Sequence, residues 1–135
     1  MSNKVIFTAP DGQEYADPDF QWLTDLVTHA DDGYWASGSG DAGLRFERDG
    51  KPHAEMVLII RAAYGAMVHH LYAADGLEYV MSEPHLGQTE VTVKYGGNPW
   101  SLPRAFFINR RKAADAVQHF LQDGQRKEGG NWVEF

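Results

Sequence analysis

Cysteine is absent from this sequence, and long apolar runs are absent as well. Without cysteine the chain cannot form disulfides, thiolate nucleophiles or cysteine-ligated zinc sites, and this composition suits a reducing compartment. The longest aliphatic stretch, residues 56–60, is far shorter than the roughly 20 apolar residues of a membrane span. The apolar run near the N-terminus is likewise too short for a signal peptide. We therefore expect a soluble, cytoplasmic protein.

Basic residues are scarce in the first third of the chain. Residues 1–49 hold ten acidic and three basic residues, whereas residues 50–135 hold nine of each, so the first third carries the whole net charge of −7. Such one-sided charge says more about partners than about fold, and here it disfavours nucleic acid and anionic membranes and favours a basic protein. Five aspartates around one predicted helix and the loop after it concentrate this charge: Asp19, Asp25, Asp31, Asp32 and Asp41.

The N-terminal part of the chain predicts a strand and then a helix. Turn residues end a short strand over residues 5–8, and a helix follows over residues 18–30, with Asp17 as its N-cap and a proline at its first position. The acidic segment 31–33 is expected to end this helix. Its predicted core positions are Phe20, Leu23, Leu26, Val27 and Ala30.

The remainder predicts a β-meander and a second helix. Alternating apolar residues indicate strands at 44–47, 54–60, 66–72, 77–81, 91–95, 104–108 and 132–135. Asp49-Gly50 and Asp75-Gly76 are tight-turn signals. A helix over residues 110–123 has Asn109 as its cap and Gly124 as its terminator. We predict one α+β domain over residues 1–135, in which a single antiparallel β-sheet (a meander) carries two main helices packed on it.

The six histidines do not predict a metal site. His69 and His70 are adjacent in a predicted strand, so their side chains point to opposite faces. His53 and Glu55 share a strand face, but two ligands do not make a site. The spacings HExxH and His-x-His do not occur. We expect no metal, no cofactor and no catalytic residues, and therefore no enzymatic activity.

Two segments offer weaker signals for anion binding. Gly38-Ser39-Gly40 lacks the spacing of a nucleophile elbow or a P-loop, and a flexible connector is the simpler interpretation. Arg110, Arg111 and Lys112 occupy the first turn of a predicted helix, where they are either exposed and ion-paired or part of an anion site. The alternative function is therefore a small ligand-binding domain or enzyme with a His/Arg-lined anion site.

Large aromatic side chains are the remaining candidates for contacts with a partner. Most of them belong to the core by default. Trp35 and Trp100, however, lie beside loops rich in glycine or proline, where an exposed anchor for a partner is more plausible.

The C-terminal run NPWSLPRAFFINRRKAADAVQHFLQDGQRKEGGNWVEF resembles the Imm1 family of immunity proteins of bacterial polymorphic toxin systems. The shared features are a proline-containing approach to a short strand (99–108), a helix with the pattern A-x-x-A-V-x-x-F-L (113–121), and a glycine followed by a tryptophan-containing final strand (132–135). The earlier segment YWASGSGDAGLRF is also similar to that family's entry into its sheet.

The resemblance implies a protein without enzymatic activity that binds and neutralises the C-terminal domain of a cognate toxin. Toxins paired with such proteins are often nucleases or nucleic-acid deaminases, which are usually basic because they hold phosphate. From charge and loop position we expect the contact surface to contain Asp19, Asp25, Asp31, Asp32, Tyr34, Trp35, Asp41 and Trp100. We expect no contact with nucleic acid or membrane, and a free protein that is a monomer or a weak dimer.

Overall fold

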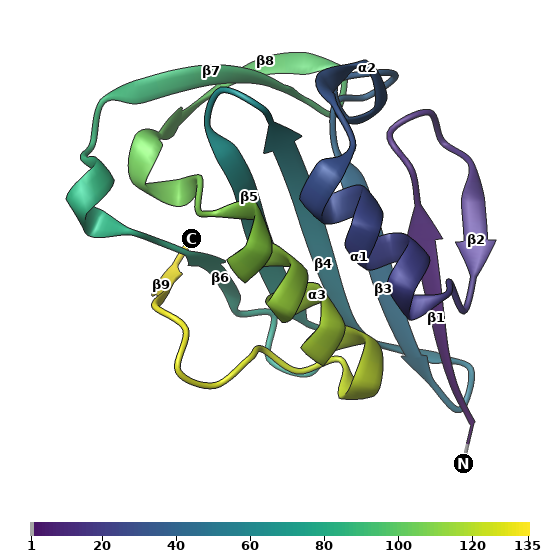
Figure 1. Ribbon diagram of the computed structural model, residues 1–135. Helices are drawn as coiled ribbons and strands as arrows, with labels where there is room; N and C mark the ends of the chain where they lie inside the picture. The colour runs from purple at the N-terminus through teal and green to yellow at the C-terminus, as the bar shows by residue number, and fades with distance from the viewer. Residues whose placement is uncertain (1) are drawn as a thin grey trace.

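The computed structural model describes residues 2–135 and contains a seven-stranded antiparallel sheet with helices on one face (Figure 1). The strands are β1 (Asn3–Thr8), β2 (Glu14–Ala16), β3 (Ala42–Arg48), β4 (Lys51–Arg61), β5 (Gly65–Tyr72), β6 (Glu78–Met81), β7 (Glu90–Tyr95), β8 (Asn98–Pro103) and β9 (Trp132–Glu134). The helices are α1 (Phe20–His29), α2 (Asp32–Trp35) and α3 (Arg110–Asp123), with 3-10 turns η1 (Pro84–Leu86) and η2 (Arg104–Phe106).

The main sheet has the order β2-β1-β3-β4-β5-β6-β9, with every pair antiparallel. The prediction of an α+β fold with a main meander is therefore confirmed. Asp49 and Gly50 both have positive φ, of 53° and 77°, as the hairpin between β3 and β4 requires. Leu58, Ile59 and Ile60 are all completely buried, because β4 lies in the middle of the sheet with protein on both faces.

Both main helices pack side by side on the same face of the sheet (Figure 1). In α1 the buried positions are Leu23 and Val27. In α3 the buried stripe follows the predicted helical period: Ala113, Ala114, Ala116, Val117 and Phe120. Asn109 and Gly124 cap α3 as predicted, since the Asn109 side chain accepts from the Arg111 amide and Gly124 has φ of 74°.

The structure corrects the predicted start and end of α1. Its N-cap is Asp19, whose carboxylate accepts from the amide of Trp22, and not Asp17. Asp17 instead has a φ of 46° and forms a reciprocal pair of hydrogen bonds with the backbone of Val5. Phe20 was expected in the core but is exposed, because it precedes the first buried turn. Asp32 does not merely end α1; it opens the short helix α2.

Two C-terminal predictions also change. β7 does not join the main sheet but pairs with β8 in a two-stranded ribbon that arches across its end (Figure 1). Residues 104–108 were predicted as a strand, but they form η2 and a single bridge from Ile108 to Ala66. The Phe107 amide returns to the carbonyl of Arg104 within this turn and therefore cannot join a strand ladder. The ribbon covers a second, smaller core built from Ile59, Met67, Val80, Val93, Leu102 and Phe107.

Candidate protein-binding surface

Three segments far apart in sequence meet at one corner of the molecule. We call residues 10–12, 31–41 and 94–98 together the acidic corner. The Ser39 amide donates to the carbonyl of Pro10 at 3.0 Å, and the Gly97 amide donates to the carbonyl of Ser39 at 2.9 Å. The Gly96 amide donates to Asp41 Oδ1 at 2.9 Å. In Figure 1 the corner lies where α2 meets the free end of the β7–β8 ribbon.

The glycines of this loop allow close backbone contact. A Cβ atom on Gly38, whose φ is 52°, would lie 2.0 Å from the carbonyl oxygen of Pro10. One on Gly40, whose φ is 83°, would lie 2.6 Å from the carbonyl oxygen of Lys94. The segment predicted to be a flexible connector is therefore fixed on both sides, and its glycines serve contact with neighbouring backbone.

Arg61 lies buried beneath the corner, with only 8% of its surface exposed. Its guanidinium donates to the carbonyls of Ile60 at 2.8 Å, Gly40 at 2.9 Å, Lys94 at 3.2 Å and Trp35 at 3.3 Å. Burial lowers the pKa of Arg61, and the nearby charges of Asp32 and Asp41 partly oppose that shift. This arginine joins α2, the loop after it and the end of β7. The predicted strand 54–60, which ends directly before Arg61, gave no signal of these contacts.

Of the acidic side chains of the corner, Asp41 is half-buried and the others are exposed, and backbone amides partly fix them. Asp32 Oδ1 accepts from the Ala62 amide at 2.8 Å, and Asp11 Oδ1 accepts from the Gln13 amide at 2.9 Å. Asp31 precedes α2 and is exposed. Together with Asp41 these residues form a negative surface on a rigid loop framework.

Tyr34 belongs to the same corner. Its hydroxyl is buried and has no hydrogen-bond partner among residues 2–135. Burial, and then the neighbouring Tyr15 and Asp11, raises the pKa of Tyr34 to about 12. Its phenol therefore stays neutral at physiological pH.

The two tryptophans predicted as anchors have different environments. Trp35 is only 1% exposed, and its indole donates to the carbonyl of Leu26 at 3.2 Å. The prediction of an exposed Trp35 is wrong, because the indole ring of Trp35 is packed in the main hydrophobic core. Trp100 is 49% exposed and packs against Tyr95, with ring centroids 5.4 Å apart. Because Tyr95 directly precedes Gly96, Trp100 lies beside the acidic corner.

The remaining predicted contact residues, Asp19 and Asp25, belong to the N-cap and the body of α1. Asp19 caps the helix at its first turn, and Asp25 is exposed and accepts from the side chain of Gln21. Asp19 precedes the far end of α1, about 15 Å along the helix from the corner. The structure therefore gathers Asp31, Asp32, Asp41 and Trp100 with Tyr34, and it leaves Asp19 at the opposite end of α1 and Asp25 on that helix.

None of these acids is neutralised by an ion pair within the described chain. Six close contacts between an acidic side chain and a lysine, arginine or histidine side chain form among residues 2–135: Arg45–Glu47, His69–Glu78, His85–Glu83, Lys112–Glu83, His119–Asp123 and Lys127–Asp115. The three with histidine are ion pairs only when the imidazole is protonated. All six use acidic residues outside segment 11–41. The negative charge of the corner thus remains uncompensated by a direct cationic contact.

The cations at the start of α3 contact protein groups. Arg110 donates to three carbonyls at the C-terminal end of α1, those of Leu26, Val27 and Ala30. Lys112 pairs with Glu83 at 3.1 Å. Arg111 is exposed, and its side chain is the remaining cation of the predicted anion site.

The histidines are distributed over both faces of the sheet, as predicted for His69 and His70. His70 contacts the carbonyl of Gly124 at 2.9 Å, and burial lowers its pKa to about 4. His69 Nε2 lies 2.9 Å from the carboxylate of Glu78, and burial lowers the pKa of His69. His53 lies at the β-bulge opposite Phe46, with its ring against that side chain, so it does not share the outward face of Glu55.

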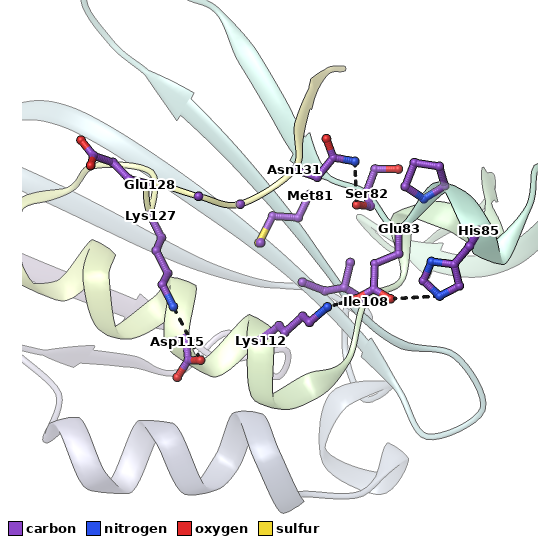
Figure 2. Close-up of a pocket in the computed structure, with 13 residues that line it drawn as sticks. Met81, Ser82, Glu83, His85, Ile108, Lys112, Asp115, Lys127, Glu128 and Asn131 are labelled. Atoms are coloured by element: carbon purple, nitrogen blue, oxygen red, sulfur yellow. Dashed lines mark hydrogen bonds and ion pairs between the residues drawn. The ribbon is translucent and has the colours of Figure 1, made fainter.

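A pocket of about 500 Å³ lies between α3, η1 and the segment 127–131 (Figure 2). Met81 and Ile108 line its apolar part, while Lys112 and Lys127 point toward acidic neighbours within it (Figure 2). Lys112 forms an ion pair with Glu83, and Lys127 Nζ lies 3.7 Å from Asp115 Oδ2. Both lysines of the pocket are thus paired with acidic side chains, whereas Glu128 has no ion-pair partner among residues 2–135. The pocket could not be predicted from the sequence, because its lining comes from four separate segments.

Two further findings concern the described residues 2–135. No three histidine, aspartate or glutamate side chains in that part of the chain lie close enough to hold a metal ion. None of the helices described is both long and apolar enough to cross a membrane.

Comparison with protein-family models found no match to this chain, and comparison with curated proteins found none either. The resemblance to the Imm1 family therefore stays a prediction.

Proposed function

We propose that this protein is an immunity protein that binds a basic toxin domain through the acidic corner and Trp100. The toxin class follows from the resemblance to the Imm1 family: a nuclease or nucleic-acid deaminase, made by the same bacterium. The observation that carries the proposal is the set of exposed and half-exposed aspartates that have no ion-pair partner among residues 2–135, placed beside an exposed tryptophan.

The rigidity of the corner supports a binding role. Four guanidinium bonds from Arg61 and the backbone bonds of Ser39 and Gly97 hold its loops before any partner arrives. A surface that is already ordered loses little conformational entropy on binding, so more of the interaction free energy appears as affinity.

The chemistry of the corner supports a basic protein as the occupant. Its charges would attract lysine and arginine side chains and speed association, because opposite fields steer the encounter. Trp100 would supply the large aromatic contact that interface centres favour. Nucleic acid is disfavoured, because the chain carries a net charge of −7 and phosphate would be repelled at this surface.

Co-expression with the toxin domain encoded beside its gene tests the proposal. We expect the two proteins to copurify and the bacterium to survive toxin expression only when this protein is present. Failure of both would refute the immunity function.

Charge reversal then tests the surface. Asp31→Lys should slow association about tenfold at low salt and flatten its salt dependence, because Asp31 carries charge without a backbone contact from its side chain. Glu134→Lys makes the same change of charge at an exposed position of strand β9; it is the matched control and should leave association unchanged. Equal association rates for the two variants would remove Asp31 from the interface.

The alternative function, a small ligand-binding domain, is favoured by a different observation, the pocket in Figure 2. Phosphates, nucleotides and divalent metals can be screened by thermal shift, since a ligand of the native state raises the melting temperature. A shift that is lost in Lys112→Ala would favour this alternative over the immunity function.

A further inference from the structure

A second recess, of about 490 Å³, lies at the start of α1, the end of that helix opposite to the acidic corner. It is lined by Tyr15, Ala16, Asp17, Pro18, Asp19 and Trp22. We propose that this recess receives an arginine side chain of the partner, stacked on Trp22 and paired with Asp17 and Asp19. The inference rests on the proposed function for the identity of the partner, but the recess itself is testable without that partner.

Tyr15 and Trp22 form an aromatic wall of the recess. Trp22 is 37% exposed although its ring packs on Tyr15 at 4.9 Å and edge-on against Phe7 at 6.0 Å. These contacts fix the indole in one orientation while leaving part of it open to solvent. An indole face attracts a guanidinium through its quadrupole and through planar stacking.

Asp17 and Asp19 place two carboxylates at the same recess. Asp17 Oδ1 accepts from the Val5 amide at 3.0 Å, and Asp19 Oδ2 accepts from the Trp22 amide at 3.0 Å. The second oxygen of each carboxylate accepts no hydrogen bond from residues 2–135, and neither aspartate belongs to an ion pair there. Both carboxylates are thus held in place on one side and able to accept from a donor on the other.

The shape and charge of the recess favour arginine over other occupants. A planar guanidinium can stack on an aromatic ring and donate to carboxylates at its edge in the same pose. An ammonium group offers a point charge without that plane, and an anion would meet two like charges. The basic partner inferred above supplies arginine, and the charge of residues 1–49 would draw it to this recess.

The experiment uses N-acetyl-arginine amide as the probe and NMR of the free protein as the readout. We expect saturable shifts of the Trp22 indole resonance and of the amides of residues 15–22 at millimolar probe, with weaker effects from the lysine analogue and none from the glutamine analogue. The variant Asp17→Asn, Asp19→Asn should weaken arginine binding at least fivefold. Asparagine keeps both backbone acceptors and caps helices well, so the fold is retained. Asp25→Asn, on the exposed face of α1 outside the recess, is the matched control and should bind the probe as the wild type does.

The outcomes separate this inference from the proposed function. No shift in the recess, or equal binding by the double variant, overturns the inference whether or not a toxin binds. If the toxin binds and the double variant binds it as tightly as the wild type, the inference is also overturned. If the probe binds as expected and the toxin does not, the recess stands and the proposed function fails.

Discussion

The stability of the helical layer is predicted to depend on Arg110. Its guanidinium donates from Nε to the carbonyl of Val27 at 2.8 Å and from Nη2 to those of Ala30 at 2.6 Å and Leu26 at 3.3 Å. The last carbonyls of a helix have no partner within it and carry the negative end of its dipole. Arg110 therefore caps α1 from the first turn of α3 and joins the two helices. Burial lowers the pKa of Arg110 and the charge of Asp32 opposes that shift, so the side chain remains a cation.

The loss expected for Arg110→Ala follows from these contacts. A hydrogen bond to a charged group contributes about 1.5–3 kcal/mol, but the three here share one side chain and water can reach part of the site. We therefore expect a net loss of about 2–3 kcal/mol. For a chain of 135 residues, 1 kcal/mol corresponds to roughly 3.5 °C, so the melting temperature should fall by about 7–11 °C.

The assay is urea unfolding and thermal melting of Arg110→Ala beside Arg111→Ala. Both substitutions remove one cation from the positive end of α3, but only the first removes a cap from α1. Arg111 is exposed, and its loss should change the free energy of unfolding by less than about 0.5 kcal/mol. Arg110→Lys should give an intermediate value, because lysine keeps the charge and loses the planar fork. Equal destabilisation by the two alanine variants would refute the reasoning.

Two further predictions concern the acidic corner and the buried histidine. Gly38→Ala should lower the free energy of unfolding by about 2–3 kcal/mol, since its Cβ would overlap the Pro10 carbonyl. Gly12→Ala is the control: Gly12 has a φ of 92° and no atom near its Cβ, so the loss should be only about 1 kcal/mol. Urea unfolding compares the two variants, and equal losses would contradict the close approach of Gly38 to Pro10. His70 has a pKa of about 4 in the fold, below its ordinary 6.5. As the pH falls below 6.5, His70 therefore becomes protonated in the unfolded chain while it is still neutral in the folded protein, and this favours unfolding. Its contribution to stability is therefore full above pH 6.5 and falls as the pH drops toward 4, by up to about 3 kcal/mol. Unfolding at several pH values should show this loss reduced in His70→Gln, and an unchanged pH dependence would count against it.

Elements with local signals could be predicted from the sequence. The helix α3 has both a regular apolar period and capping residues at each end, Asn109 and Gly124, and it forms as expected. The turn at Asp49-Gly50 specifies its hairpin through backbone conformation alone. These features need no knowledge of the rest of the chain.

Elements that depend on distant partners could not be predicted. The alternation of Val91, Val93 and Tyr95 is the same whether β7 pairs with β6 or with β8, so the pattern cannot say which sheet receives it. Trp35 follows a helix and precedes a Gly/Ser loop, which is typical of a surface position. Only the tertiary position of α2, which packs against β4, brings its indole to the carbonyl of Leu26 in α1.

The candidate surface was predicted in part for the same reason. Charge composition indicated Asp31, Asp32 and Asp41, and the loop position indicated Trp100, but composition cannot say that Asp19 lies at the opposite end of α1. Nor could it indicate Arg61, whose acceptor carbonyls include those of residues 26 and 33 positions away in sequence.

The roles of Arg61 and Arg110 explain how an acidic surface can coexist with internal cations. Each guanidinium binds three or four backbone carbonyls and no carboxylate. Carbonyl oxygens carry only partial charge, so these arginines order the loops and helix ends without occupying the carboxylates of Asp32 and Asp41, although their positive charges lie near enough to interact with those aspartates. Had the same two cations paired with Asp32 or Asp41, those carboxylates would be occupied, and the cations of a basic partner would find fewer free acceptors there. The arrangement thus combines loop order with carboxylates that are free to pair with the cations of a partner, and the proposed binding of a basic protein depends on both properties.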